Sequence, residues 1–287
     1  MSNQTKQKIK DIIRCIQIYN YVRKNKNKNS LLAYTDKIQE REMTLLCNGP
    51  SLKEVLPSIP YMKNQDFVVV NFFANSDLFK QIKPKIYCLC DGMFFNNIPN
   101  NNKLEQVKEL YKILDQEVNW PMNLIIPIHR MNDFKKLSKL NNPFIKVIGA
   151  NQIDFELSEN KLHKFYKKNW ACPNPQTVAI MAIYASINTG YKTINLYGVD
   201  HTYTQTYCVN EQNQLCMKYE HFYDNNVELK PVIDALGNHP TVSKELQTIV
   251  NIFRSHEKLE AYAKAVNCKI WNCTKGSFID AYERRLK

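Results

Sequence analysis

Tyrosine and histidine side chains gather in and beside one polar stretch of the chain, residues 204–240. A tyrosine hydroxyl can donate a hydrogen bond to negative charge that develops on a leaving group. An imidazole that titrates near neutral pH can take the proton from an attacking hydroxyl. The sequence therefore offers candidate leaving-group donors, Tyr203, Tyr207, Tyr219 and Tyr223, and candidate general bases, His201, His221 and His239.

The same stretch shows neither a helical nor a strand period. A loop of that length inside a compact domain is usually a functional lid or a disordered segment. We expect residues 204–240 to form a small lid that brings these side chains over a site.

A second candidate feature is the turn Cys47-Asn48-Gly49-Pro50-Ser51-Leu52, which follows an apolar run and opens a short helix. Backbone N–H groups at such a helix start can bind an anion. Ser51 is expected to cap the helix, with Glu54 completing a capping box. The alternative interpretation is a strand-to-helix turn without a ligand. Asn48, Gly49 and Ser51 are the candidate binding residues.

Other polar residues stand where further elements begin or end. Asn71 and Asp91 could equally be ordinary turn-forming residues. The start of the apolar segment 176–189 is a further potential anion site. The candidates are Asn71, Asp91, Gly198 and Asp200 after apolar runs, and Gln176 and Thr177 before the apolar segment.

These residues need a scaffold that brings distant turns together, and the pattern after residue 40 predicts one. Short apolar runs alternate with helical patterns, which is typical of an α/β fold with a mainly parallel open sheet and helices on both faces. Ligands in such folds bind beyond the carboxyl ends of the strands. The expected strands are 43–47, 66–70, 85–90, 123–128, 144–148, 193–197 and 269–273, and the clearest helices are 103–117, 176–189 and 243–266.

The first 40 residues form a separate basic segment. Residues 1–30 carry eight basic side chains and one acidic one, a net charge of +7 out of +12 for the chain. Residues 6–22 predict an amphipathic helix, with Ile9, Ile12, Ile13, Ile16 and Tyr19 on one face. Two interpretations stay open: a helix packed on the domain or on a second subunit, and a helix that lies on anionic lipid.

Several function classes lack their motifs. The chain has no G-x-G-x-x-G, no P-loop, no H-E-x-x-H and no D-x-D, so we expect neither a bound metal nor a cofactor. Lysine outnumbers arginine 32 to 7, which disfavours sequence-specific nucleic-acid binding. Nine irregularly spaced cysteines, with no secretory signal and no long apolar span, indicate reduced thiols and a cytoplasmic protein.

The motifs resemble a known family. N-G-P-S-L-K-E after the first strand and an asparagine after the second resemble the bacterial lipooligosaccharide sialyltransferases of glycosyltransferase family 42. So do T-V-A-I-M-A-I-Y-A-S-I-N-T-G-Y-K-T-I-N-L-Y-G-V-D and the C-terminal K-I-W-N-C-T-K-G-S-F-I-D. The blocks occur in the family's order over residues 43–280. N-G-P-S-L is also shared with a wider set of sugar-processing proteins.

The resemblance implies a single nucleotide-binding domain of GT-A-like architecture over residues 41–287, with the lid at 204–240. It implies transfer of sialic acid or a related nonulosonic acid from a CMP-activated donor, without metal and with inversion. The acceptor would be a terminal sugar, such as galactose, of a lipooligosaccharide or another surface glycan. We expect the enzyme to be cytoplasmic and peripheral to the inner membrane, with the N-terminal helix on the anionic membrane surface. A homo-oligomer is the other use of that helix that stays open.

The resemblance also assigns roles to residues. Asn48, Gly49 and Ser51 match nucleotide contacts, and Asn71 matches a donor contact. Asp91 stands where the family has asparagine, and Gln176 and Thr177 replace its Thr-Ser-Gly. Tyr203 and Tyr207 map loosely onto its phosphate-stabilising tyrosines. His221 best matches its catalytic histidine, His239 resembles that turn too, and His201 could orient or bind the nucleotide. The alternatives are another sugar- or pterin-modifying enzyme with N-G-P-S-L, or a non-catalytic nucleotide-binding component.

Overall fold

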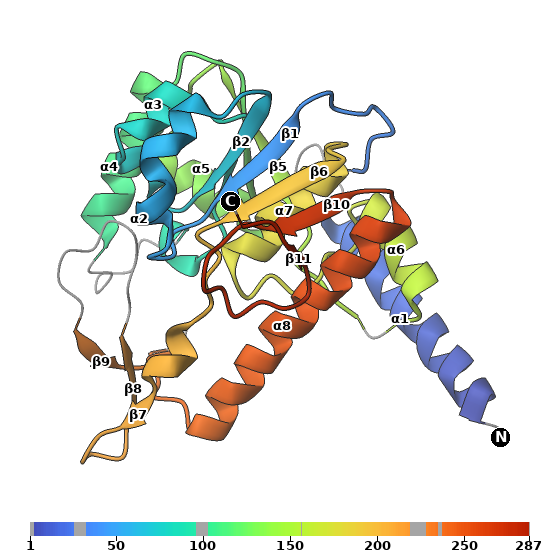
Figure 1. Cartoon of the computed structure of the whole chain (residues 1–287). Coiled ribbons are helices and arrows are strands. Elements are labelled where there is room, and N and C mark those ends of the chain that lie inside the picture. Colours follow the sequence, from blue (N-terminus) through green and yellow to red (C-terminus); the bar gives the residue numbers. More distant parts are fainter. Residues whose placement is uncertain are drawn as a thin grey trace.

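A parallel sheet forms the centre of the fold, as the alternation predicts. The computed structural model describes residues 3–25, 33–95, 103–155, 157–218, 228–234 and 237–286. The strand order is β11-β10-β6-β1-β2-β3-β4-β5, and each neighbouring pair is parallel (Figure 1). The strands are β1 (Glu42–Leu46), β2 (Gln65–Val70), β3 (Ile86–Cys88), β4 (Met122–Pro127), β5 (Ile145–Ala150), β6 (Thr193–Tyr197), β10 (Lys269–Asn272) and β11 (Glu283–Arg284). The α/β prediction is confirmed, and in this sheet only the two-residue β11 was not expected.

Helices flank the sheet. They are α1 (Asn3–Asn25), α2 (Leu52–Val55), α3 (Leu78–Ile82), α4 (Leu104–Glu117), α5 (Met131–Ser138), α6 (Glu159–Lys167), α7 (Val178–Asn188) and α8 (Val242–Ala265). The 3-10 helices are η1 (Leu56–Tyr61), η2 (Phe73–Asn75), η3 (Gly92–Phe94), η4 (Ile128–Arg130) and η5 (Tyr203–Thr206). The predicted long helices correspond to α4, α7 and α8 within two residues. Sequence reasoning missed α3, α5 and α6, because helices of five to nine residues show too few turns for a period to stand out.

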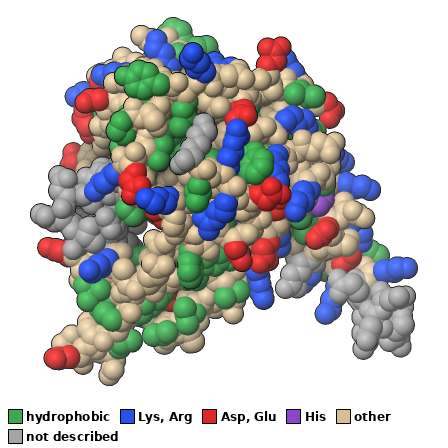
Figure 2. Space-filling view, in the orientation of Figure 1, with side chains coloured by type: hydrophobic (Ala, Val, Ile, Leu, Met, Phe, Trp, Pro, Cys, Tyr) green, Lys and Arg blue, Asp and Glu red, His purple; other side chains and the backbone are tan. Residues whose placement is uncertain are grey.

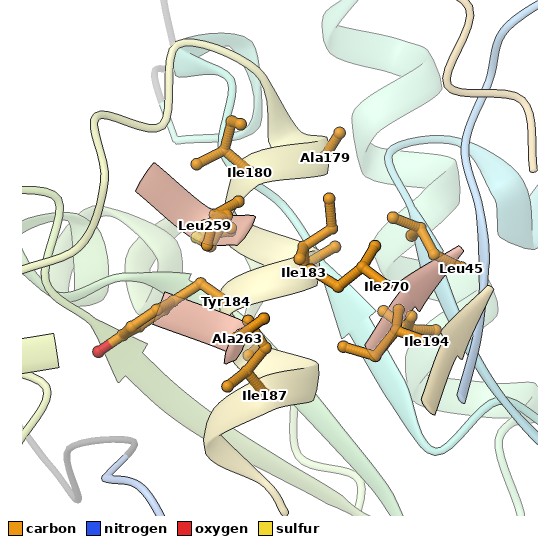
Figure 3. Packing of buried hydrophobic residues seen from close by; sticks show 14 of the residues in the cluster. Leu45, Ala179, Ile180, Ile183, Tyr184, Ile187, Ile194, Leu259, Ala263 and Ile270 are labelled. Carbon is orange, nitrogen blue, oxygen red and sulfur yellow. The ribbon is translucent and has the colours of Figure 1, made fainter. Parts of the chain in front are cut away.

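Successive side chains of a strand point to opposite faces of the sheet, and both faces are buried and apolar. Leu45 belongs to the core cluster shared with α6, α7 and α8, whereas its neighbour Leu46 belongs to the cluster shared with α2, α3, α4 and α5. Figure 3 shows Ile183 of α7 beside Ile194 and Ile270 of the sheet. Helices on both faces explain why these strands read as continuous apolar runs rather than as alternating ones.

The direction in which the chain adds strands to the sheet reverses once, and the reversal lies between β1 and β6. The chain runs outward from β1 through β5 on one side, and β6 and β10 then add to the other side. In open α/β sheets the crevice at such a switch point, at the carboxyl ends of the strands, is where ligands bind. The turns after β1 and β6 are those that carry the Asn48 and Asp200 motifs.

Residues 204–240 contain more regular structure than their sequence predicts. A small antiparallel sheet forms from β7 (Cys208–Val209), β8 (Leu215–Lys218) and β9 (Leu229–Pro231), below the main sheet in Figure 1. The sequence pattern did not predict these strands. Strands of two to four residues are too short for a detectable alternation of polar and apolar residues.

Helix α1 packs on the domain, as one interpretation held, but with an unexpected face. Ile18 and Val22 are buried, and the buried carboxylate of Asp11 pairs with Nζ of Lys161 on α6 at 2.8 Å. The opposite face points away from the domain: Ile9, Ile12, Ile13, Ile16 and Tyr19 are between 44% and 58% exposed. The isoleucine face is therefore not the face by which α1 contacts the domain. In Figure 1 the helix projects from the body towards the N-terminus.

Positive charge is dispersed rather than concentrated on the visible face of the molecule. Figure 2 shows Lys and Arg side chains interspersed with Asp and Glu side chains over that face. Among the residues that the structure describes, none of the helices combines the length and apolar character needed to cross a bilayer.

Candidate active site

A cavity of about 260 Å³ lies at the switch point of the sheet. Its volume is close to the lower end of the range of about 300–1,000 Å³ that is typical of small-molecule sites. Eight of the residues singled out from the sequence line it: Asn48, Gly49, Asn71, Thr177, Gly198, Asp200, His201 and Tyr203. Parallel strands place these turns at one edge, so residues separated by over 150 positions meet.

Four side chains around this cavity have a buried polar atom with no hydrogen-bond partner among the described residues. Both amide atoms of Asn48, Oδ1 of Asn71, Oγ1 of Thr177 and the hydroxyl of Tyr203 are shielded from solvent and unpaired within the described residues. A buried polar group without a partner costs about 1–3 kcal/mol. All four residues line the same cavity, so one ligand with matching donors and acceptors could remove the cost at all of them.

Asp200 fixes the turn after β1. Its two carboxylate oxygens accept from the backbone N–H of Ser51 at 3.2 Å and from Oγ of Ser51 at 2.9 Å. Ser51 therefore does not cap α2 with its side chain, and the predicted capping box is wrong. Glu54 instead pairs with Lys275 at 3.4 Å. Ser51 bonds to Asp200 rather than to the first N–H groups of α2, because the carboxylate supplies two charged acceptors to this one serine.

Gly49 is required by this close packing. A Cβ atom built on Gly49 would lie 1.8 Å from Oδ2 of Asp200 and 2.5 Å from the carbonyl oxygen of Gly198. The N–H of Gly49 donates to that same carbonyl at 2.9 Å. Gly198 itself has a φ of +69°, in the left-handed region that favours glycine. The turns after β1 and β6 thus form one tightly packed unit.

Asn71 adopts a left-handed conformation, with φ of +52°. Its carbonyl oxygen accepts a hydrogen bond from the Tyr87 hydroxyl, which in turn accepts from the N–H of Ala74 at 3.1 Å. Asparagine tolerates this region better than most residues do. The backbone of Asn71 is thereby locked while its side-chain oxygen stays unpaired beside the cavity.

Helix α7 begins at the cavity. Thr177 precedes its first residue with extended backbone and makes no side-chain cap, and Val178 and Ala179 line the cavity. The first N–H groups of a helix have no partners within the helix and carry partial positive charge. The start of α7 can therefore accept an anionic group of a ligand, as the sequence predicts for this segment.

Other candidates lie away from the cavity. Asp91 does not line it, and its Oδ1 accepts from the N–H of Met93, which makes it a turn-forming residue. Gln176 does not line it either. Tyr207 is also outside the lining, and its hydroxyl donates to Glu245 at 3.0 Å. His239 is exposed, with Nδ1 3.0 Å from the carbonyl oxygen of Val232. His221, Tyr219 and Tyr223 are outside the described residues.

His201 lines the cavity and contacts a second histidine. Its Nε2 lies 3.1 Å from Nε2 of His256, whose Nδ1 lies 2.9 Å from the hydroxyl of Tyr282. Burial lowers the pKa of His201 to about 4, and burial and the neighbouring imidazole lower the pKa of His256 well below its ordinary value. Both rings are neutral at pH 7.

Sequence reasoning missed two residues of this region. His256 was not among the candidate residues, and it lies on the buried face of α8 with Ile252 and Leu259, at helical spacing. That spacing was the signal available. Lys218 is the one basic side chain that the described residues contribute to the cavity lining. No pattern in the sequence marks Lys218 as a cavity residue, because β8 is too short to predict.

Potential metal ligands are not grouped in this region. Within the described ranges of the chain, no three His, Cys, Asp or Glu side chains are placed to share a metal ion. The nine cysteines are free thiols. Among the described residues, the cavity lining thus offers a ligand amide, hydroxyl and carboxylate groups, one imidazole, backbone N–H groups and one lysine.

The fold is similar to two solved structures of the sialyltransferase CstII from Campylobacter jejuni, one with cytidine-5'-monophosphate and one with CMP-3FNeuAc. The first is 17% identical, with a TM-score of 0.43, and covers 88% of this chain and 86% of that chain. The second is 17% identical, with a TM-score of 0.44, and covers 86% and 87%. No family model and no curated protein matches the chain. At these values the likeness carries no evidence about the activity of this chain.

Proposed function

We propose that this chain is an inverting glycosyltransferase that moves sialic acid or a related nonulosonic acid from a CMP-activated donor to a terminal sugar of a bacterial surface glycan. The observation that carries the proposal is the ring of unpaired buried polar groups on Asn48, Asn71, Thr177 and Tyr203 around one cavity. A nucleotide and a hydroxylated sugar present many donors and acceptors at once, which is what such a ring requires. The N-G-P-S-L motif and the other blocks quoted above add the family resemblance.

The charges around the cavity suit a monophosphate leaving group. Transfer from a CMP-sugar has an oxocarbenium-like transition state, in which negative charge grows on the departing phosphate. The start of α7, the Tyr203 hydroxyl and Lys218 are available to stabilise that charge. We propose that they do so in place of a metal ion.

The acceptor hydroxyl needs a base that is neutral and accessible near pH 7. His221 remains our first choice and His239 the second. His239 keeps Nε2 available, because the contact with Val232 involves Nδ1. His201 is the weakest of the three, since its low pKa and its contact with His256 leave it poorly suited to accept a proton.

We expect CMP to stabilise the protein without added metal. A ligand that binds only the native state raises the unfolding temperature, and an excess of about 100 times Kd contributes about 2.7 kcal/mol. The measurement is thermal unfolding with CMP, UDP and ADP, each with EDTA or with Mn²⁺. Stabilisation by CMP that persists in EDTA supports the proposal. Stronger stabilisation by UDP with Mn²⁺ would contradict it.

We further propose that α1 holds the enzyme on an anionic lipid surface, at the cytoplasmic side of the inner membrane. The exposed face with Ile12, Ile13 and Ile16 is apolar, and Lys8 and Lys10 lie beside it and are exposed. Basic residues near an anionic bilayer contribute about 1 kcal/mol each, and salt weakens that attraction. The Asp11–Lys161 pair keeps the opposite face on the domain, so the isoleucines can contact lipid without unfolding the helix.

Replacing Ile12, Ile13 and Ile16 together with glutamine should weaken binding to phosphatidylglycerol vesicles by at least about tenfold, because the apolar area that lipid would bury is lost. Co-sedimentation measures the binding, and parental binding should fall as salt rises. Activity on a soluble acceptor should stay unchanged. Replacing the equally exposed Ile38 and Ile233 with glutamine is the matched control. If the triple variant instead turns a dimer into a monomer and vesicle binding is absent from the parent, the face contacts a second copy.

A further inference from the structure

Three side chains, two of them buried, form a hydrogen-bonded row that ends at the cavity. The row runs from the Tyr282 hydroxyl to Nδ1 of His256 at 2.9 Å, and from Nε2 of His256 to Nε2 of His201 at 3.1 Å. Tyr282 is 3% exposed and His256 is fully buried, whereas His201 lines the cavity. The row crosses three elements, since the residues come from the C-terminal segment, from α8 and from the turn after β6.

The partners of Tyr282 decide the direction of the hydrogen bonds. Within the described residues, His256 is the one hydrogen-bond partner of the Tyr282 hydroxyl. Burial raises the pKa of Tyr282 well above its ordinary value, so the phenol keeps its proton. If the phenol accepted from His256, its own O–H would be buried without an acceptor, which is costly. The phenol therefore donates to Nδ1 of His256.

The direction of the Tyr282 hydrogen bond decides which nitrogen carries the proton in His256 and in His201. His256 is neutral and accepts at Nδ1, so its proton is on Nε2 and is donated to Nε2 of His201. His201 is also neutral and accepts at Nε2, so its own proton must be on Nδ1. The row thus fixes His201 in a single tautomer.

The Nδ1–H of His201 is left for the contents of the cavity. Nδ1 has no hydrogen-bond partner among the described residues and is not one of the solvent-inaccessible unpaired atoms. The unpaired Tyr203 hydroxyl belongs to the neighbouring ring, with the two ring centres 5.8 Å apart. His201 and Tyr203 thus both line the cavity, and each brings to it a hydrogen-bond donor that has no partner among the described residues. His201 is held with φ of +51°, which the turn after β6 must support.

We infer that His201 is a neutral hydrogen-bond donor to an anionic oxygen of the bound ligand, with His256 and Tyr282 as the positioning residues that fix its tautomer. The ligand oxygen belongs to the phosphate of the nucleotide donor, so this role rests on the proposed function. A neutral imidazole donates without titrating near pH 7. The same row removes His201 from the candidate bases, because the only nitrogen it could use as an acceptor is occupied by His256.

The tautomer can be measured in the free protein. Long-range ¹H–¹⁵N NMR spectra at pH 7 distinguish the two ring nitrogens, and loss of one ring in His201→Asn assigns His201. We expect a protonated Nδ1 on His201 and a protonated Nε2 on His256. Tyr282→Phe removes the first donor of the row and should shift the tautomer populations of both rings. A protonated Nε2 on His201 in the parent would overturn the inference.

Affinities for CMP and cytidine test the contact with phosphate. Hydrogen bonds to charged groups predict a loss of about 10–100-fold in CMP affinity for His201→Ala, with cytidine affinity changed less than about threefold. His201→Asn should restore CMP binding, because its amide nitrogen can replace Nδ1 and asparagine tolerates the left-handed backbone. His163→Ala, on α6 beside Tyr166 and Tyr262, is the matched control and should leave both affinities unchanged.

The two proposals fail in different ways. Equal losses of CMP and cytidine affinity in His201→Ala, or no loss of either, would contradict the role of His201 while leaving the enzyme a CMP-binding protein. A parent that binds no CMP would contradict the proposed function instead. Inorganic phosphate would then replace CMP as the probe, and a phosphate affinity that His201→Ala does not lower would also overturn the inference.

Discussion

Replacing His221 with alanine is expected to lower turnover by about 10²–10⁴-fold, the usual contribution of a general base. CMP affinity should stay close to that of the parent, because the imidazole acts on the acceptor hydroxyl and not on the nucleotide. Steady-state kinetics with a soluble acceptor measures the first effect, and thermal unfolding with CMP measures the second. The acidic limb of the pH–rate profile should have a His-like pKa in the parent and be absent from the variant.

His239→Ala is the comparison that assigns the base. Near-parental transfer by His221→Ala together with an inactive His239→Ala would move the assignment to His239. The loss in His239→Ala must then include the acidic limb, because its Nδ1 contact with Val232 could also make it a structural residue. If both variants remain active, the histidine-base mechanism is wrong for this protein.

Gly49→Ala is expected to have the second large effect, on stability and nucleotide binding together. The new Cβ atom would lie 1.8 Å from a carboxylate oxygen of Asp200, so the two turns at the switch point must separate. Overpacking of this kind costs about 3 kcal/mol, which lowers the unfolding temperature by about 5 °C in a chain of this size. CMP should no longer stabilise the variant, because Asn48 and the turn after β6 move with the clash.

Gly237→Ala separates a clash from backbone strain. No atom of the described residues lies within 4 Å of a Cβ built there, but φ is +84°, so only the left-handed strain of about 1–2 kcal/mol applies. Its CMP binding should match that of the parent. If Gly49→Ala unfolds no earlier than Gly237→Ala and still binds CMP, the tight contact between the two turns is not needed.

The sheet could be predicted because its signal is local. Each buried strand is a short apolar run, and the glycines and polar residues that end the runs mark the binding edge. The same reasoning predicted that Asn48, Asn71 and Asp200 lie at one edge of the sheet, together with Asp91, which does not line the cavity. It did so because parallel strands put their carboxyl ends on one side.

The remaining errors have a common physical cause, which is competition between partners distant in sequence. Ser51 has a good local acceptor arrangement for a cap, yet Asp200 binds it from 149 residues away. His256 has no site motif, and only the packing of α8 against the turn after β6 brings it to His201. The apolar stripe of α1 predicts an amphipathic helix but does not say which face the domain covers.

A donor screen with CMP-sugars tests the central claim most directly. Purified full-length protein is incubated with CMP-activated nonulosonic acids and with UDP-, GDP- and ADP-sugars, in EDTA, and released nucleotide is measured with and without a galactose-terminated acceptor. We predict release of CMP from at least one CMP-nonulosonate, faster with acceptor and unaffected by EDTA, with formation of the inverted glycoside. Release only from a nucleoside diphosphate sugar, or activity that EDTA abolishes and Mn²⁺ restores, would contradict the account.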